Sequence, residues 1–376
     1  MKPAQAFWLR CLEHDDIYKG RYEGYYCIGC EYYKTEKDLV DGKCPDHNAE
    51  PIWLSEENYF FRLSNYSEML LAFFEQNPDV VKPRGKLEEA KNFIKSGLTD
   101  ISISRRKEAL TWGIPVPNDP EQIIYVWFEA LTNYAAVVGF SADEQRFQEW
   151  WPGVQICGPD NLRFQSIIWQ AMLASAKLPF SKHTLVHGTI LGPDGRKMAK
   201  TIGNVVSPFE QVSKYNPEIV RYYLLAGLPT YADAAYKETD LILLHNTNLA
   251  NNYGNLVNRI IVLANKKGVS LDRTNAVQAA FRETVDKQKT AIEHAYESYN
   301  IFEAAQRVNA LLTYGNKYID EEKPWKFEYP EVVLNNLHYL LLIASDLYEP
   351  IIPVSSQRAL EALRAQQPAI LFTKLI

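Results

Sequence analysis

The sequence of 376 residues lacks any run of 18 or more apolar residues, so it predicts no transmembrane helix and no membrane partner. Its first residues, MKPAQAFWLRCLEHDD, carry charges where a signal peptide needs an apolar stretch, and we therefore expect a cytoplasmic protein. An excess of basic charge is also missing, because the formal net charge is −6. This excludes a generally basic nucleic-acid coat but not a local RNA-binding patch. The remaining composition, 47% apolar and 23% charged, is that of a globular protein with two or three domains.

Cysteine is scarce as well, and the odd count of five without a signal peptide argues against a disulfide framework. Cys27 and Cys30 form a CxxC hook, and Cys44 and His47 form a CxxH hook after thirteen intervening residues. Two such hooks close tetrahedrally around Zn²⁺. Because all four ligand positions would come from the protein, we expect a structural rather than a catalytic zinc site. The alternative is a redox CxxC near an unrelated cysteine and histidine.

Apolar periodicity divides the chain into segments of different structure. Residues 1–58 predict a short helix and the zinc knuckle, and residues 59–96 have mainly helical spacing. Residues 97–120 contain a strand-like ISIS and a turn rich in glycine and proline. From residue 121, short strands such as 123–128 alternate with helices, which is typical of half of a doubly wound parallel sheet. From about residue 241 the 3.6-residue period predicts an antiparallel helix bundle, so the fold class is α/β plus all-α.

Residues 192–204, GPDGRKMAKTIGN, place Lys197 and Lys200 after a Gly-rich turn that follows a strand-like segment. By chemistry this is a mobile phosphate-binding loop, in which two ammonium groups follow the charge of a triphosphate through a transition state. A Lys-x-x-Lys taken alone is more often a solvated surface. In this context the segment resembles the KMSKS signature of class I aminoacyl-tRNA synthetases, with Ala199 and Thr201 in place of its two serines.

The resemblance extends to the methionyl-tRNA synthetases over nearly the whole chain. The segments ENYFFRLSNY, ISISR, WGIPVP, YVWFEALTNY, CGPDNLRFQSIIWQAML, NLANNYGNLVNR and DEEKPW match that family in order. The resemblance implies a connective-peptide domain with the zinc knuckle at 1–118 and the second half of a Rossmann catalytic domain at 119–192. It further implies a KMSKS-type loop and stem-contact region at 193–240 and an anticodon-binding helix bundle at 241–376.

Individual site residues follow from the same resemblance. Aromatic contact suits a flexible thioether, a carboxylate at a strand end suits ribose hydroxyls, and Asn, Arg and Trp suit unpaired bases. Without the resemblance, the tryptophans and the tyrosine would be interpreted as packing residues and Arg105 as a surface arginine. The implied roles are methionine binding by Trp127, Ala130, Tyr134 and Gln165; ATP binding by Gly158, Asp160, Lys197 and Lys200; catalysis by Lys197, Lys200 and Arg105; anticodon binding by Asn255, Arg259 and Trp325; and zinc binding by Cys27, Cys30, Cys44 and His47.

The sequence also departs from the family. None of the seven histidines forms the His-x-Gly-His signature that contacts ATP phosphates, so we expect that about the first hundred residues of a usual synthetase, with half of the sheet, are missing. Pro159 replaces a usual lysine, Glu129 an aspartate and Gln165 a histidine.

We therefore expect a methionine–tRNA ligase that takes methionine, ATP with Mg²⁺ and tRNA(Met), and that needs a separate N-terminal half chain or an uncropped protein for activity. The alternative is a synthetase-derived tRNA(Met)-binding protein without activation chemistry. The missing histidines and Pro159 favour this alternative, whereas the retained Trp127, Lys197 and Lys200 oppose it. A zinc hydrolase has little support because the zinc site has no open position.

Overall fold

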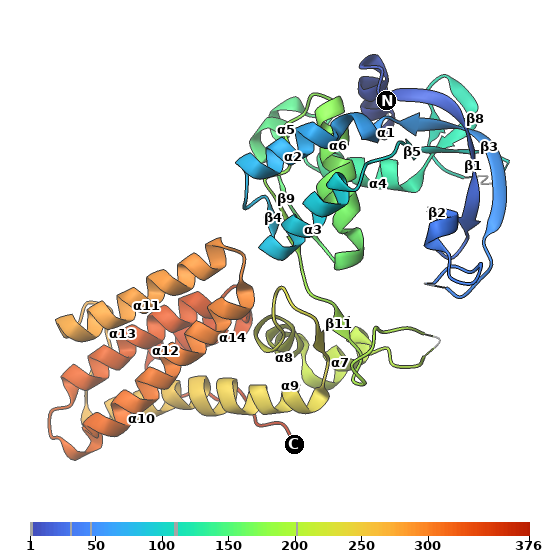
Figure 1. Ribbon diagram of the computed structural model, residues 1–376. Helices are drawn as coiled ribbons and strands as arrows, with labels where there is room; N and C mark the ends of the chain where they lie inside the picture. Colours follow the sequence, from blue (N-terminus) through green and yellow to red (C-terminus); the bar gives the residue numbers. More distant parts are fainter. Residues whose placement is uncertain (1–2, 31, 46, 109–111, 201) are drawn as a thin grey trace. The chain divides into compact units, whose positions relative to one another are not determined.

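The computed structural model describes residues 3–30, 32–45, 47–108, 112–200 and 202–376 (Figure 1). The chain divides into two compact units, Met1–Val186 and His187–Ile376, and each is described by itself. Among the helices of the described residues, none has both the length and the apolar character that a membrane crossing requires.

The first unit is dominated at its amino-terminal side by a long antiparallel ribbon (Figure 1). Strands β1 (Ile17–Cys27) and β3 (Ile52–Phe61) pair along their length, and β2 (Tyr32–Lys34) and β5 (Ile101–Ser102) extend the sheet in the order β2-β1-β3-β5. The preceding helix α1 (Pro3–Glu13) confirms the short helix expected there. The ribbon itself was not expected, and it places the zinc knuckle at the far end of β1.

A small parallel sheet forms the second layer of this unit. Its order is β4-β10-β9, from β4 (Val81–Lys82), β10 (His183–Val186) and β9 (Val154–Cys157). The parallel pairing of β9 and β10 agrees with the doubly wound pattern. The helices of this unit are α2 (Ser67–Gln76), α3 (Arg84–Lys95), α4 (Val126–Val137), α5 (Glu144–Trp150) and α6 (Trp169–Ser175).

The strand expected over residues 123–128 differs from the structure. Residues Asp119–Ile124 form β8, which lies in an antiparallel sheet with β6 (Ser104–Arg106) and β7 (Pro115–Val116), and α4 begins at Val126. A continuous apolar run does not show where a strand ends and a buried helix begins, since apolar side chains are buried in both. Ile123 and Ile124 are buried from the strand and Phe128 from the helix, which packs against Phe7 and Trp8 of α1.

The second unit contains the helix bundle that periodicity predicts. Its core lies where α12 crosses α10 and α13. At Gly315 a Cβ atom would lie 3.0 Å from a Leu256 methyl and 3.2 Å from a Leu340 methyl, so glycine permits this close approach. The helices of the bundle are α9 (Glu238–Leu244), α10 (Asn255–Lys267), α11 (Ala279–Glu297), α12 (Ile301–Glu322), α13 (Glu331–Tyr348) and α14 (Pro353–Ala365), with a π-helical segment η6 (His245–Gly254) joining α9 to α10.

Before the bundle, the second unit has two short helices, α7 (Pro208–Tyr215) and α8 (Pro217–Tyr222), and a π-helical segment η5 (Tyr223–Gly227). Strands β11 (Ile190–Leu191) and β12 (Ala234–Ala235) form a short parallel pair. The loop with Lys197 and Lys200 leaves this pair after β11.

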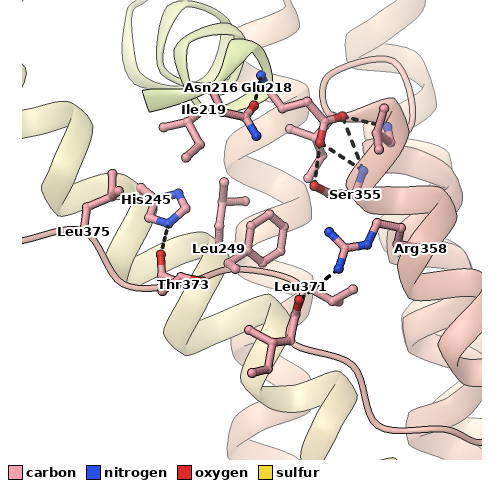
Figure 2. A pocket seen from close by; sticks show the side chains of 14 residues that line it. Asn216, Glu218, Ile219, His245, Leu249, Ser355, Arg358, Leu371, Thr373 and Leu375 are labelled. Atoms are coloured by element: carbon pink, nitrogen blue, oxygen red, sulfur yellow. Dashed lines mark hydrogen bonds between the residues drawn. The ribbon is translucent and has the colours of Figure 1, made fainter. Parts of the chain in front are cut away.

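Helix α14 begins at a carboxylate supplied by α8. Glu218 accepts hydrogen bonds from the backbone N–H of Val354, at 2.6 Å, and of Ser355, at 3.0 Å, and from the Ser355 hydroxyl at 2.5 Å. A negative charge there satisfies free N–H groups and complements the helix dipole. Figure 2 shows these bonds at the edge of a cavity of about 570 Å³, which His245 and Arg358 also line.

The segment after α14 runs extended along η6 and α10. Asn246 both donates to the carbonyl of Leu375 and accepts from its N–H, at 2.8 and 2.9 Å. Asn258 holds Ala369 in the same two ways, at 2.9 and 3.0 Å. Each asparagine is thus a two-point clamp on the backbone, and His245 adds a contact to the Thr373 carbonyl (Figure 2).

Candidate functional site

The four zinc-ligand candidates converge. Their ligand atoms all lie within 4.8 Å of one another. Cys30 Sγ lies 3.4 Å from Cys44 Sγ and 3.2 Å from His47 Nδ1, and His47 Nδ1 lies 3.9 Å from the sulfurs of Cys27 and Cys44. Zinc–sulfur bonds of about 2.3 Å in a tetrahedron separate ligand atoms by roughly 3.8 Å. Three thiols and an imidazole at these separations fit a closed Zn²⁺ site.

Local backbone geometry explains the convergence. Cys27 is the last residue of β1, and the second hook follows a turn in which Gly42 has a φ of +75°. A Cβ atom on Gly29 would lie 2.6 Å from His47 Cδ2, so only glycine lets the imidazole approach the first hook. The N–H of Cys44 donates to Ala49 and its carbonyl accepts from Asn48, which closes the second hook on itself.

The candidate methionine-pocket residues come from two helical segments of the first unit. Trp127 lies in α4, and its ring stacks on Phe164 with centroids 3.9 Å apart and an interplanar angle of 15°. Gln165 Nε2 donates to the hydroxyl of Tyr134 at 2.7 Å. Ala130 is exposed on α4, between Trp127 and Tyr134. Phe164 was not expected, and its only sequence signal is its place next to Gln165. In the structure both residues lie in a π-helical turn, Phe164–Ile168.

The candidate ribose-binding residues follow β9 directly. Gly158 precedes a 3₁₀ turn, Pro159–Asn161, and its carbonyl accepts from the Asn161 N–H at 3.1 Å. Asp160 is exposed on this turn, at the carboxyl edge of the parallel strand. Open α/β sheets bind their ligands at this edge.

Arg105 lies in β6 and is fixed by neighbouring groups. Its Nη1 donates to the Ser104 carbonyl at 2.7 Å and to the Ser102 hydroxyl at 3.0 Å. Its guanidinium carbon lies 4.1 Å from the centre of the Tyr125 ring, two residues before Trp127. These contacts place Arg105 beside the amino-terminal end of α4.

In the second unit, Lys197 and Lys200 lie on the loop after β11. Lys197 forms an isolated antiparallel bridge with Leu191, and the N–H of Gly192 donates to the Arg196 carbonyl at 2.8 Å. The loop is therefore a hairpin up to Lys197 and turns back after it. Thr201 lies outside the described residues.

The anticodon-binding candidates gather where α12 ends beside α10. Asn255 is exposed at the start of α10, and Arg259 one turn later forms an ion pair of 2.7 Å with Asp320 of α12. Trp325 follows in a 3₁₀ turn with 44% of its surface exposed. The Lys267 ammonium donates to the Phe327 carbonyl and ties this turn to the end of α10. An exposed aromatic ring and two polar side chains are suited to unpaired bases.

Comparisons with known proteins agree with this arrangement. The family model described as tRNA synthetases class I (M) matches residues 38–261, and that described as anticodon binding domain of methionyl tRNA ligase matches residues 272–372. Among solved structures, Mycobacterium tuberculosis methionyl-tRNA synthetase in complex with methionyl-adenylate is similar, with a TM-score of 0.89 and 30% identity over 96% of this chain and 74% of that chain. The fold and the family-model match place this chain among the class I tRNA synthetases. Within that class, the chain belongs to the methionyl-tRNA synthetase family.

Two curated relatives give the extent of the match. The methionine–tRNA ligase of Caldanaerobacter subterraneus subsp. tengcongensis is 37% identical, over 96% of this chain and 58% of that protein. The methionine–tRNA ligase of Thermosynechococcus vestitus is 39% identical, over 85% of this chain and 62% of that protein. The chain thus spans about three fifths of the length of these relatives, and the family resemblance inferred from the sequence is confirmed.

Proposed function

We propose that the protein is a methionine–tRNA ligase, which activates methionine with ATP and transfers it to tRNA(Met). The observation that supports this most is that one chain matches both the class I synthetase model and the methionyl anticodon-binding model. A protein that only bound tRNA would have no need of an amino-acid pocket or of the lysine loop.

The chemistry asks for positioning and charge stabilisation rather than covalent help from the protein. In this proposal Trp127, Tyr134 and Gln165 hold the methionine side chain, with Ala130 leaving space between them. Asp160, next to Gly158, binds the ribose hydroxyls. Lys197 and Lys200 stabilise the phosphate charge of ATP, which arrives with Mg²⁺, and Arg105 closes the site from β6.

The zinc-binding residues have a different role in the proposal. Cys27, Cys30, Cys44 and His47 would hold Zn²⁺, which supplies folding energy to a knuckle that has little apolar core. In the second unit, Asn255, Arg259 and Trp325 read the CAU anticodon. The four regions 1–118, 119–192, 193–240 and 241–376 serve as knuckle, half-sheet, lysine loop and anticodon bundle.

The test is methionine-dependent ATP–pyrophosphate exchange, measured with this chain alone and after addition of a polypeptide with the His-x-Gly-His half of the sheet. We expect activity when that half is supplied in the same or a separate chain. Lys200→Ala should abolish it, whereas Lys182→Ala, which changes another exposed lysine, should not. An absence of exchange in every arm, with tRNA(Met) still bound, would instead support a synthetase-derived RNA-binding protein.

A further inference from the structure

The loop that carries Lys197 and Lys200 is closed by two side chains that are ten residues apart. Asn204 Nδ2 lies 3.0 Å from Asp194 Oδ1 and 3.3 Å from Asp194 Oδ2. Asp194 precedes the first lysine and Asn204 follows the second. Their contact therefore joins the two ends of the segment that presents both ammonium groups.

Asn204 also contacts the backbone within that segment. Its Oδ1 accepts from the N–H of Ala199 at 2.9 Å, and its Nδ2 lies 3.3 Å from the carbonyl of Lys197. The side-chain amide of Asn204 thus binds the main chain on both sides of Met198. A rotation of the backbone at either place would break one of these bonds and redirect a lysine side chain.

Asp194 is held as firmly from its own side. Its Oδ1 accepts from the N–H of Arg196 at 3.1 Å, and its Oδ2 accepts from Nε and Nη2 of the Arg196 guanidinium at 2.8 and 2.7 Å. Donation by Asn204, the Arg196 N–H and the guanidinium lowers the pKa of the Asp194 carboxyl to about 2. The carboxylate is ionised throughout the neutral range.

The glycines of the loop make this contact possible. A Cβ atom on Gly192 would lie 2.8 Å from Asn204 Nδ2 and 2.9 Å from the Asn204 carbonyl oxygen, so a side chain there would displace the amide. Gly195 and Gly203 have φ values of +76° and +74°, in the region that glycine adopts without strain. These turns bring Asp194 and Asn204 face to face.

We propose that Asp194 and Asn204 are positioning residues for Lys197 and Lys200. Their contact fixes the backbone between the lysines so that both ammonium groups face the phosphates of the nucleotide together. This inference rests on the proposed function, since it assigns the lysines to ATP. Neither Asp194 nor Asn204 touches substrate in the inference, and their effect passes through the loop backbone.

The test uses a variant pair in which the second change restores the donor–acceptor contact between the two side chains, while the bond from Asn204 Nδ2 to the Lys197 carbonyl is absent from both variants. Asn204→Asp places a second carboxylate about 3 Å from that of Asp194 and removes the donor. We expect kcat for pyrophosphate exchange to fall about 10–100-fold, as misplacement of a reacting group does, with an unchanged KM for methionine. Adding Asp194→Asn supplies an amide donor from the other side, while the carboxylate at position 204 still accepts from Ala199. The double variant lacks the Lys197 bond and the ion pair with Arg196, so it should recover only part of the lost kcat, to about threefold or more above Asn204→Asp.

Asn251→Asp, at an exposed position of the same unit, is the matched control and should leave kcat for pyrophosphate exchange unchanged. Hydrogen exchange at the amides of Arg196 and Ala199 gives a readout that does not depend on activity. Protection should fall in Asn204→Asp and return in the double variant. A double variant no more active than Asn204→Asp, or an unchanged kcat in Asn204→Asp, would overturn the inference.

If the wild type shows no pyrophosphate exchange, either alone or with the His-x-Gly-His half added, the proposed function fails. The assignment of the lysines to ATP then fails with it. The hydrogen-exchange pattern then still reports whether the contact orders the loop. The two failures are therefore distinguishable.

Discussion

The amide of Gln165 donates to the hydroxyl oxygen of Tyr134 at 2.7 Å, from one helical segment to the next. Gln165 is 3% exposed, and its Oε1 has no hydrogen-bond partner in the part of the chain that the structure describes. Because the Tyr134 oxygen accepts from Gln165, its own hydrogen is available to donate to a ligand. The pair thus orients a hydroxyl donor on α4, the helix that also carries Trp127.

The first prediction concerns this pair. Tyr134→Phe removes the hydroxyl that would donate to methionine, as well as the acceptor of the Gln165 amide, and leaving a buried polar partner unpaired in the complex costs about 1–3 kcal/mol. We expect the KM for methionine in pyrophosphate exchange to rise about tenfold or more, with the KM for ATP unchanged. Tyr329→Phe, at a position that is 75% exposed, is the control and should change neither constant. An equal rise of both constants in Tyr134→Phe would contradict the assignment to methionine.

Metal content is predicted to depend on the glycine between the first two ligands. Gly29→Ala would drive a methyl group into His47, so bound zinc should fall from about one ion per chain to well under half. Gly85→Ala is the matched control, because a Cβ atom there meets nothing within 4 Å. Elemental analysis of the desalted variants makes the measurement. Full zinc occupancy in Gly29→Ala would show that His47 is not a ligand.

The anticodon assignment predicts a loss of tRNA affinity. Trp325→Ala should weaken binding of tRNA(Met) by about 1–3 kcal/mol, the contribution of one stacked base. Trp150→Ala serves as the control, because Trp150 is 65% exposed and lies in the first unit. Filter binding at fixed salt gives the dissociation constants. An unchanged constant for Trp325→Ala would remove Trp325 from the anticodon site.

Stability of the second unit is predicted to depend on the carboxylate at the start of α14. Glu218→Gln places an amide N–H group against the N–H groups of Val354 and Ser355 and removes the charge. We expect the free energy of unfolding in urea to fall by about 1–3 kcal/mol. Glu361→Gln, on the exposed side of the same helix, should change it by less than about 0.5 kcal/mol. Equal effects of the two substitutions would refute the capping role.

A pH dependence follows from His338, which is 3% exposed in α13. Burial, with the nearby charge of Arg273, lowers its pKa from 6.5 to about 4. The unfolded state therefore binds more protons than the folded state between these values, and stability falls as the pH drops from 6.5 toward 4. Relative to His338→Gln, the wild type should lose about 3 kcal/mol over this window. Parallel stability curves for the two proteins would contradict this.

The sequence was informative where chemistry or period is local. The spacing of Cys27, Cys30, Cys44 and His47 predicted a cluster that the structure brings together, because the ligands themselves are diagnostic. The helix bundle was predictable because 3.6-residue periodicity extends over many turns. The ribbon of β1 and β3 was not, since IYKGRYEGYYC has no regular apolar alternation and its partner lies beyond the knuckle.

Contacts between distant residues were the least predictable part of the candidate site. The stacking of Phe164 on Trp127 joins two helical segments and requires their packing to be known. The contact of Asp194 with Asn204 depends on glycine turns at positive φ, which a sequence pattern permits but does not specify.

The clamps on the extended segment after α14 restrict the length of that segment more than its composition. Asn246 and Asn258 bind main-chain atoms of Leu375 and Ala369, so no particular side chain is needed at either place. The clamped residues are six apart in the extended segment, and the two asparagines that hold them are twelve apart along η6 and α10. Both clamps therefore engage together only when six residues of the extended segment span the distance between Asn246 and Asn258. A one-residue insertion or deletion between Ala369 and Leu375 would move the backbone of one of these residues away from its asparagine. Most replacements there would leave both clamps engaged.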